Sequence, residues 1–433
     1  MEMQVLLILF GTFGVLLALG VPVSFAIGLS SLTTILTSLP LEPAIAVVAQ
    51  RMAAGLDNFA LLAIPFFILA GNIMNQGGIA LRLINFAKVL GGRLPGALAH
   101  VNVMANMMFG SISGSAVASA AAVGGTMSPL QKKDGYDEHF SAAVNITSCP
   151  TGLLIPPSNT LIVFSLVSGG TSIAALFLAG YIPGILMGLS LMAVAGYIAK
   201  KRGYPVAEKP SLQVVWDTFL KAAPSLMLIV VIMGGIIGGI FTATEASAIA
   251  VVYTFALAVL IYREVSWKQL PKIVLESAVT TSIVLLLVGA SMGMSWAMAN
   301  ADIPYIIADA LLAISEDPLM ILLIINLILL IVGIFMDMTP AILIFTPIFL
   351  PIALDMGIDP VHFGIMMTFN LAIGICTPPV GSALFIGCSV ANVPINKIIK
   401  PLLPFYAALI AALMAVTFIP ELSLFLPELV LDY

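Results

Sequence analysis

Charged residues are what this chain has least of: Asp, Glu, Lys and Arg make up 9% of its 433 residues, against about 25% in soluble domains. Hydrophobic residues make up 61%. A soluble fold this apolar would expose large apolar patches, so the solvent must be lipid. The apolar runs are continuous rather than alternating, which favours spanning helices over a β-barrel. We therefore expect an all-α polytopic membrane protein.

Cysteine is almost as scarce, and the chain has no metal-binding spacing. The three cysteines, Cys149, Cys376 and Cys388, lie in apolar surroundings, where buried thiols are the expected state. The three histidines are too far apart to form a metal motif. We expect no disulfide, no transition-metal site and no nucleic-acid partner.

Lys and Arg are missing from one long stretch, between Lys272 and Lys397. The loops within it carry only acids, whereas the basic residues gather in other loops. By the positive-inside rule, those basic loops lie in the cytoplasm, with Arg51 as the one exception. The basic loops contain Arg82, Lys88, Arg93, Lys132, Lys133, Lys200, Lys201, Arg202, Lys209, Lys221, Arg263, Lys268, Lys272, Lys397 and Lys400.

What the sequence does have is an internal repeat. Two Gly/Pro-interrupted hydrophobic regions match each other 222 positions apart. Such paired interruptions are the best sequence pointer to the binding site of a secondary transporter. The matched residues are Ile112, Pro129, Gly135, Asp137, Pro156 and Pro157 in the first copy, and Ile334, Pro351, Gly357, Asp359, Pro378 and Pro379 in the second.

The repeat predicts the architecture. Residues 95–131 and 318–355 are each too long for one span and have a polar or Gly/Pro break, so we expect re-entrant hairpins, which must pack in protein or line a cavity. Residues 139–168 and 361–391 are expected to be broken spans. The other expected spans lie near 3–19, 21–38, 58–76, 173–199, 222–241, 243–262, 276–299 and 401–426, with interfacial stretches near 43–55, 79–92, 211–221, 264–275 and 303–315.

Each half, 1–210 and 211–433, then holds about five spans and one hairpin. An odd number of spans turns the second copy upside down. This agrees with the charge pattern, in which the first hairpin enters from the cytoplasm and the second from outside. Both termini are predicted to be periplasmic.

The breaks are where the chemistry is expected. A helix broken inside a membrane exposes carbonyl groups that replace water around sodium, and N–H groups that attract carboxylate. We expect two cation sites, each between a hairpin tip and a broken span, with an anionic substrate between them. For any single Gly or Ser, close helix packing is an equally good interpretation. The candidates here are Ser111, Ser113 and Gly152 in the first copy, and Gly333, Gly374 and Thr377 in the second.

Asp337 is the acid most clearly placed inside a hairpin. An acid within a membrane is a functional hypothesis by default, as an ion ligand or proton carrier. An acid that only bonds to the backbone at the tip is the alternative, and the sequence does not choose among these roles. The candidate substrate-binding residues are Ser115, Asn159, Asp337, Thr339, Pro379 and Ser382.

At these residues the chain resembles the large membrane subunit of tripartite ATP-independent periplasmic (TRAP) transporters, the DctM-type family. The resemblance covers essentially the whole chain. It is carried by IPFFILAGNIM from Ile64, FGSISGSAVAS, CPTGLLIPPSNT, GGIFTATEASA from Gly238, MDMTP and CTPPVGSALF, in that order.

The resemblance implies a sodium-driven importer of organic acids in the bacterial inner membrane, working by an elevator mechanism. It implies a separate small four-helix membrane subunit and a periplasmic substrate-binding protein as partners. It also implies sodium sites at the hairpin–broken-helix junctions, at Ser113, Gly152, Ile155, Pro156, Gly333, Gly374, Thr377 and Val380.

We therefore predict sodium-coupled import of a carboxylate. Which acid is carried is open: sialic acid, C4-dicarboxylates and other sugar or keto acids all fit, and sodium stoichiometry and oligomeric state are not readable. A self-sufficient sodium/carboxylate symporter of the divalent-anion type is the main alternative. An intramembrane enzyme is disfavoured because no Ser–His or paired-Asp arrangement occurs within the spans, and a channel would conduct without coupling.

Overall fold

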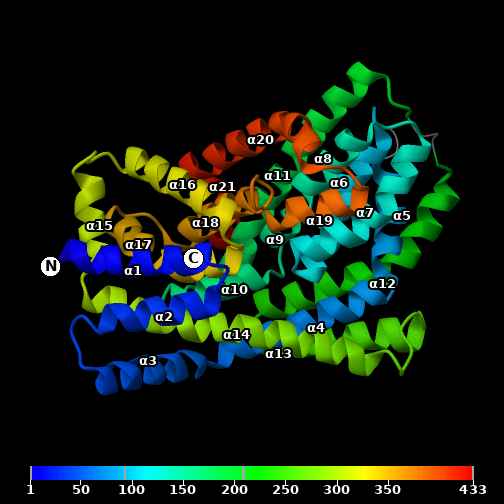
Figure 1. Ribbon diagram of the computed structural model, residues 1–433. Helices are drawn as coiled ribbons and strands as arrows, with labels where there is room; N and C mark the ends of the chain where they lie inside the picture. Colours follow the sequence, from blue (N-terminus) through cyan, green and yellow to red (C-terminus); the bar gives the residue numbers. More distant parts are fainter. Residues whose placement is uncertain (1, 92–93, 207–209, 432–433) are drawn as a thin grey trace.

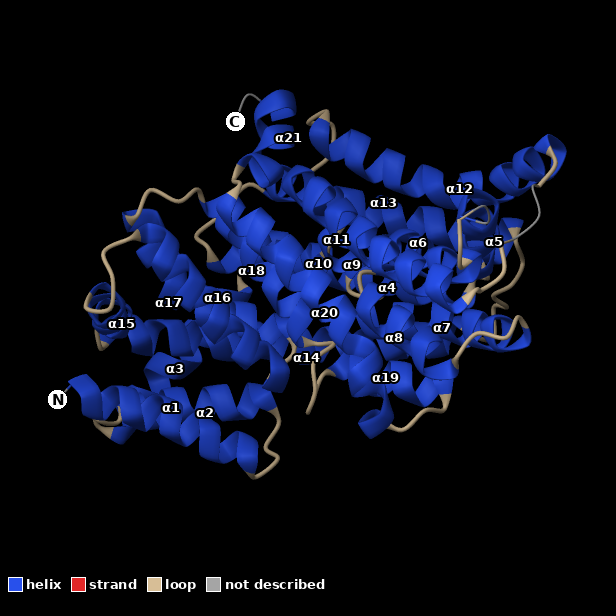
Figure 2. Ribbon diagram, turned by 90° about the horizontal axis from the view of Figure 1, so that it is seen from above, coloured by secondary structure: helices blue, strands red, loops and turns tan. Residues whose placement is uncertain are grey.

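The computed structural model describes residues 2–91, 94–206 and 210–431. Within these ranges every regular element is a helix (Figures 1 and 2). This confirms the predicted all-α membrane fold. The lack of strands follows from the long apolar runs, because a helix satisfies its own backbone hydrogen bonds in lipid.

The described residues of the first half form eleven α-helices and a short 3-10 turn before α4. They are α1 (Glu2–Ala18), α2 (Val23–Ile35), α3 (Leu41–Leu56), α4 (Ala63–Gln76), α5 (Ile79–Gly91), α6 (Ala97–Ser113), α7 (Ala116–Lys133), α8 (Glu138–Ser148), α9 (Thr151–Leu154), α10 (Asn159–Val167) and α11 (Ile173–Arg202).

In the second half, residues 210–431 form ten α-helices and a π-helical turn that extends α13. They are α12 (Leu212–Ile237), α13 (Ala243–Phe255), α14 (Leu270–Asn300), α15 (Ile303–Leu312), α16 (Pro318–Phe335), α17 (Met338–Asp355), α18 (Pro360–Gly374), α19 (Ser382–Ala391), α20 (Ile395–Phe418) and α21 (Glu421–Leu431).

Eight helices of the described chain are long and apolar enough to cross a membrane, or nine if the bent α8–α10 segment is counted as one span. The expected spans at 3–19 and 21–38 form helices of 17 and 13 residues. Both are too short to be counted among these eight helices. The longest, α14, has 31 residues, or about 46 Å at 1.5 Å per residue. It is long enough to pass beyond the hydrocarbon at its ends.

Three expected boundaries were wrong. Residues 211–221 do not form a separate interfacial helix but begin α12, and residues 270–275 likewise begin α14. In both helices the amphipathic start continues into the apolar span as one helix, and in α12 it does so despite Pro224 at the junction. The expected span at 401–426 is divided at Pro420 into α20 and α21.

The hairpins and broken helices lie where the Gly/Pro pattern predicts. The first hairpin, α6–α7, turns at Gly114 and Ser115, and the second, α16–α17, turns at Met336 and Asp337. The first broken helix bends by 51° between α9 and α10. Both breaks contain a cis peptide bond, Pro156–Pro157 in one and Pro378–Pro379 in the other.

The starts of both broken helices are capped in the same way. Asp137 caps α8, with its carboxylate accepting a hydrogen bond from the Phe140 amide at 2.8 Å. Asp359, its partner in the repeat, caps α18 and accepts from the Val361 amide at 2.7 Å. The matched acids therefore fix where each broken helix begins.

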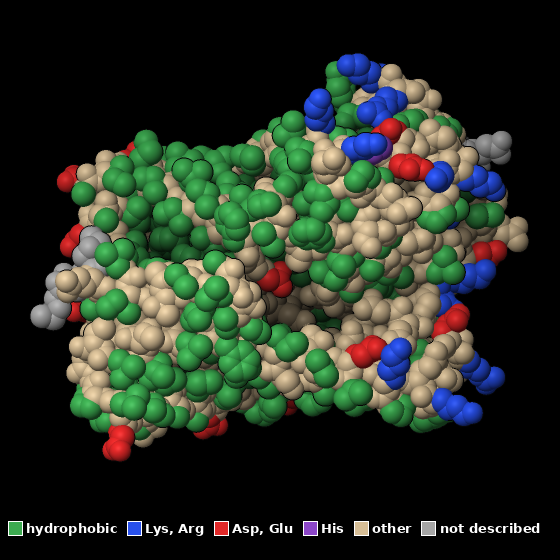
Figure 3. All heavy atoms as spheres, viewed as in Figure 1, with side chains coloured by type: hydrophobic (Ala, Val, Ile, Leu, Met, Phe, Trp, Pro, Cys, Tyr) green, Lys and Arg blue, Asp and Glu red, His purple; other side chains and the backbone are tan. Residues whose placement is uncertain are grey.

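The space-filling view shows how charge is distributed (Figure 3). Basic side chains gather at the end of the molecule where Figure 1 places α5 and the start of α12, whereas the opposite end shows acids. Between the two ends the surface is largely hydrophobic. Arg51, the exception to the charge pattern, lies 5.5 Å from the Trp296 ring of α14, a cation–π contact that makes a lone cation easier to tolerate.

Candidate functional site

The first hairpin tip is built by a glycine and a capping serine. Gly114 ends α6 in the left-handed conformation, with φ of 63°, which favours a residue without Cβ. Ser115 then caps α7, its Oγ accepting a hydrogen bond from the Ala118 amide at 3.2 Å. The tip therefore offers a hydroxyl-bearing turn at the start of a half-helix, whose N-terminus attracts negative charge.

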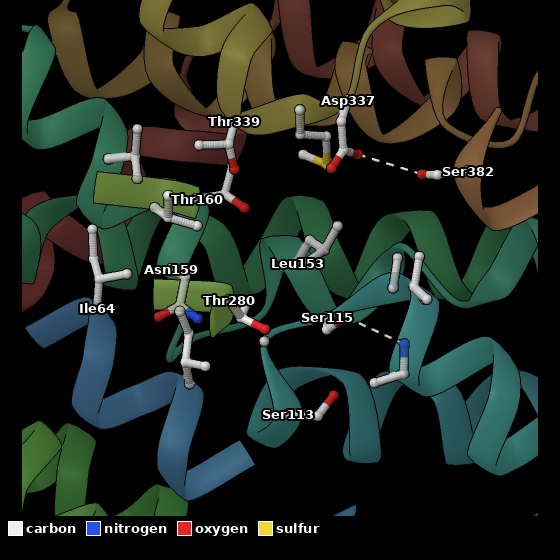
Figure 4. A pocket seen from close by; sticks show the side chains of 18 of the residues that line it. Ile64, Ser113, Ser115, Leu153, Asn159, Thr160, Thr280, Asp337, Thr339 and Ser382 are labelled. Carbon is white, nitrogen blue, oxygen red and sulfur yellow. Dashed lines mark hydrogen bonds between the residues drawn. The ribbon is translucent and has the colours of Figure 1, made fainter. Parts of the chain in front are cut away.

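The second tip differs in backbone and in chemistry, because Met336 is extended where the first tip has the left-handed Gly114. Asp337 occupies the N-cap position of α17, but its side chain makes no capping bond. One carboxylate oxygen instead accepts a hydrogen bond from Ser382 Oγ at 3.4 Å, at the start of α19 (Figure 4). The acid therefore contacts the broken helix, and its ion-ligand and proton-carrier roles stay predictions.

Each hairpin touches its broken helix through a pair of glycines. A Cβ added to Gly152 would lie 2.2 Å from the carbonyl carbon of Gly110. In the second copy, a Cβ added to Gly374 would lie 2.5 Å from the Cα of Gly333. Real contacts of this kind are about 3.5 Å or longer, so only glycine fits at either crossing. Packing alone explains the three predicted sodium-site glycines, Gly152, Gly333 and Gly374, whether or not an ion is held nearby.

A cavity of about 300 Å³ lies between the two tips. Figure 4 shows Ser113 and Ser115 of the first tip on one side, and Asp337, Thr339 and Ser382 from the second half on the other. The structure thus brings together one predicted sodium residue and five of the six predicted substrate residues. They are Ser113, Ser115, Asn159, Asp337, Thr339 and Ser382.

Several buried polar atoms at this cavity have no hydrogen-bond partner within the described chain. They are Ser113 Oγ, Asn159 Oδ1 and Asn75 Oδ1. A buried polar group without a partner costs about 1–3 kcal/mol. Three of them around one cavity indicate that a bound ion, water or polar solute completes their hydrogen bonding.

Other predicted sodium residues lie behind the cavity. Ser111 is buried and donates to the Met108 carbonyl at 3.0 Å. Ile155 and Pro156 are buried in the first break, where the Ile155 side chain packs against Gly184 of α11. Thr377 donates to the Ile373 carbonyl at 2.8 Å. These hydroxyls are already hydrogen-bonded, so any contribution to an ion would come through lone pairs or backbone carbonyls.

Two further predicted residues lie outside the cavity on the surface of the described chain. Pro379 and Val380 are exposed at the second break, and 45% of Val380 is accessible. The matching residues of the first break, Pro157 and Ser158, are buried. The two breaks share a backbone plan but differ in access.

Behind the tips, buried amides join hairpin and broken helix in both halves. Asn106 Nδ2 in α6 donates to Ser148 Oγ in α8 at 2.8 Å. Asn370 Nδ2 in α18, the repeat partner of Ser148, donates to Asn326 Oδ1 in α16 at 2.7 Å. These bonds hold each tip in register with its break.

Sequence reasoning missed the contribution of α4 and α14. Asn72 and Asn75 of α4 line the cavity, as does Thr280 of α14. Asn72 Nδ2 also donates to Ser277 Oγ of α14 at 2.9 Å. The sequence analysis names neither these asparagines nor Thr280 as site residues, because a single polar residue in an apolar helix has the same pattern as a packing contact. No group of three metal-ligating His, Cys, Asp or Glu side chains occurs in the described residues.

Comparison with known proteins agrees with this geometry. A family model described as the DctM component of the tripartite ATP-independent periplasmic transporter matches residues 10–422. The chain is 63% identical to the uncharacterized protein YgiK of Salmonella typhimurium, over 98% of this chain and 97% of that one. It is 41% identical to the sialic acid TRAP transporter large permease protein SiaM of Vibrio cholerae, over 98% of this chain and 99% of SiaM.

A further relative is the C4-dicarboxylate TRAP transporter large permease protein DctM of Rhodobacter capsulatus, 36% identical over 98% of this chain and 99% of that protein. In structure, the chain resembles the Alcanivorax borkumensis YdaH transporter, reported to have an unusual topology. The TM-score is 0.65 at 12% identity, covering 87% of this chain and 88% of that one, which supports the fold alone. The chain is a transporter subunit, not an enzyme, and it belongs to the DctM family of TRAP transporter large permease subunits.

Proposed function

We propose that this large permease subunit imports a small organic acid by sodium-coupled symport. The observation that carries the proposal is the 300 Å³ cavity, in which both hairpin tips meet. It presents hydroxyl and amide groups and one acid, and no Lys or Arg lines it. A carboxylate bound there must be stabilised by half-helix N-termini, hydroxyls and bound cations together.

Relatives support a carboxylate as the substrate. Their names give sialic acid, C4-dicarboxylates and 2,3-diketo-L-gulonate, and each of these compounds is an organic acid. The polar half of the cavity is suited to this class, because Ser115 and Ser382 stand at starts of half-helices. The identity of the acid remains open among such compounds.

Sodium is proposed because the site needs positive charge that the chain does not supply. Two ions, one behind each tip, would neutralise Asp337 and an incoming carboxylate. A tenfold sodium gradient provides about 1.4 kcal/mol per ion, so two ions would sustain about 100-fold accumulation of substrate. Sodium and substrate would then strengthen each other's binding by the same factor.

The charge distribution supports a location in the bacterial inner membrane with the basic end in the cytoplasm (Figure 3). Both termini would then be periplasmic. For movement we propose an elevator in which the hairpins and broken helices travel together. The buried bonds from Asn106 and Asn370 support this, since they join each hairpin firmly to its broken helix.

The proposed partners are a small four-helix membrane subunit and a periplasmic substrate-binding protein. Family membership supports both, because the family is by description a tripartite and periplasmic transporter. Val279 and Ile283 on α14 are 53% and 55% exposed. This apolar surface is suited to contact with lipid or with a membrane partner.

The test is uptake of a labelled organic acid into proteoliposomes that contain this subunit and its small membrane partner. We expect uptake to need the binding protein and an inward sodium gradient, and to fall to background when potassium replaces sodium. Uptake that continues unchanged without sodium would refute sodium coupling. Sodium-driven uptake by this chain alone would instead establish a self-sufficient symporter.

A further inference from the structure

A second cavity, remote from the transport site, lies at the basic end of the molecule. It has a volume of about 520 Å³ and is formed by α8, α11 and α20, which Figure 1 shows together. Three cationic side chains line it: Lys201 and Arg202 from the end of α11, and Lys400 from the start of α20. The transport mechanism uses none of them.

Arg202 is held in place by its neighbours. Its Nη1 lies 3.5 Å from Asp137 Oδ1 and donates to the Tyr204 hydroxyl at 3.2 Å. Its guanidinium carbon lies 5.6 Å from the centre of the Phe140 ring, a cation–π contact. Arg202 is therefore held in one position at the side of the cavity. Asp137 partly balances the positive charge of Arg202.

The two lysines have no such partner. Lys201 and Lys400 have no carboxylate of a described residue within 4.0 Å, although both line the cavity. Among the described residues these two ammonium groups have no carboxylate partner, and beside the fixed guanidinium they make a site of positive charge. Such a site favours an anion with several acceptor oxygens, as a phosphate has.

A row of exposed apolar side chains extends from this cavity along the outer surface of α11. On α11, Ile185, Leu189, Ala193 and Tyr197 precede Lys201 at intervals of four residues, which places them on one helix face. All four are exposed, Tyr197 by 71%. An exposed tyrosine next to a cationic end is typical of the membrane–water boundary.

The neighbouring helix continues this surface. On α20, Pro404, Ala407 and Ala411 follow Lys400 and are exposed. An exposed apolar face on these two neighbouring helices therefore extends from the cations along the spans.

We propose that this cavity binds the phosphate of an anionic phospholipid, with an acyl chain lying along α11 and α20. Basic pockets between helices on the cytoplasmic side are suited to such headgroups. A free phosphate ion would use only the three cations. The exposed apolar face distinguishes the two, because it adds affinity only for a molecule with a hydrocarbon chain.

The test measures retention of phosphatidylglycerol by the detergent-purified chain with native mass spectrometry, against phosphatidylcholine. The charge variant is Lys201→Gln with Lys400→Gln. Its control is Lys133→Gln with Lys268→Gln, which removes the same charge from exposed lysines that line neither this cavity nor the transport cavity. Thermal unfolding of each variant checks that the fold is intact.

We expect the unaltered chain to bind one phosphatidylglycerol in preference to phosphatidylcholine. The charge variant should bind it about 30-fold more weakly, from the loss of two lysine–phosphate attractions, while the control variant binds normally. Ala193→Trp, which places a bulky ring on the exposed apolar face of α11 without changing charge, should also weaken binding, and inorganic phosphate should not compete. Equal lipid binding by the charge and control variants would overturn the site. Displacement by inorganic phosphate with no effect of Ala193→Trp would show a phosphate site instead of a lipid site.

Discussion

Replacing Gly152 by alanine is the sharpest test of the crossing between the first hairpin and its broken helix. The added Cβ would lie 2.2 Å from the Gly110 carbonyl carbon and 2.5 Å from the Ser111 amide nitrogen. An ordinary carbon–carbon contact is about 3.5–4.0 Å, so the two segments must separate by more than about 1 Å. Both obstructing groups are backbone atoms, which cannot rotate aside as a side chain can.

We expect two consequences of different size. Overpacking of this kind costs about 1–3 kcal/mol, and the backbone contact favours the upper end, about 3 kcal/mol. Ion ligands must stay within about 0.2 Å of their proper distance, so a 1 Å shift at the junction removes the proposed sodium site altogether. Sodium should then neither stabilise the variant nor drive uptake.

The assay is thermal unfolding of purified protein in sodium and in potassium, followed by uptake in proteoliposomes. A site filled to 100 times its dissociation constant stabilises a protein by about 2.7 kcal/mol, and Gly152→Ala should lose that stabilisation. Gly110→Ala meets the Gly152 Cα at 3.0 Å and should have a milder effect. Gly14→Ala, with nothing within 4 Å, is the matched control. A Gly152→Ala protein with normal stability and normal sodium response would refute the reasoning.

Three further predictions follow from the described contacts. Asp337→Asn removes the negative charge that faces Ser382. Because a hydrogen bond to a charged group is worth about 1.5–3 kcal/mol, sodium-dependent uptake should fall about 10- to 100-fold. Unchanged uptake kinetics would show that Asp337 is a structural acid. Asn145→Ala breaks the 2.9 Å bond to the Ala120 carbonyl and should cost about 2–3 kcal/mol in thermal unfolding, whereas a loss near zero would show that the amide is not needed. Asp359→Ala removes the α18 cap and should cost about 1 kcal/mol, measured the same way; equal melting temperatures would contradict the capping role.

The sequence predicted the fold class and the interruptions well because these depend on local rules. A proline removes a backbone donor, and a glycine permits a left-handed turn, wherever the chain places them. Gly114, Pro156 and Pro157 illustrate this. The repeat places matching interruptions in the second half, which supports the same prediction a second time. Helix starts such as Leu212 could not be placed, since an amphipathic turn and the beginning of a span have the same pattern.

The site was predictable only in the part that is duplicated. Ser115 and Asp337 stood out because they lie at matched breaks, and the structure places both at one cavity. Thr280 and Asn75 come from helices without a break, where a single polar residue looks the same as a packing contact. Their role depends on α4 and α14 lying against the tips, which is a tertiary fact.

The unequal access of the two breaks limits what can lie next to them. Pro379 and Val380 are exposed in the second break, whereas the matching Pro157 and Ser158 are buried. Irregular backbone at membrane depth is tolerated only when it is packed in protein or lines a water-filled space. The second break therefore cannot face lipid, and either water or a partner subunit must cover it. If water covers it, the ion site proposed there exchanges ions without movement of the first hairpin, and the two sites fill one after the other rather than together.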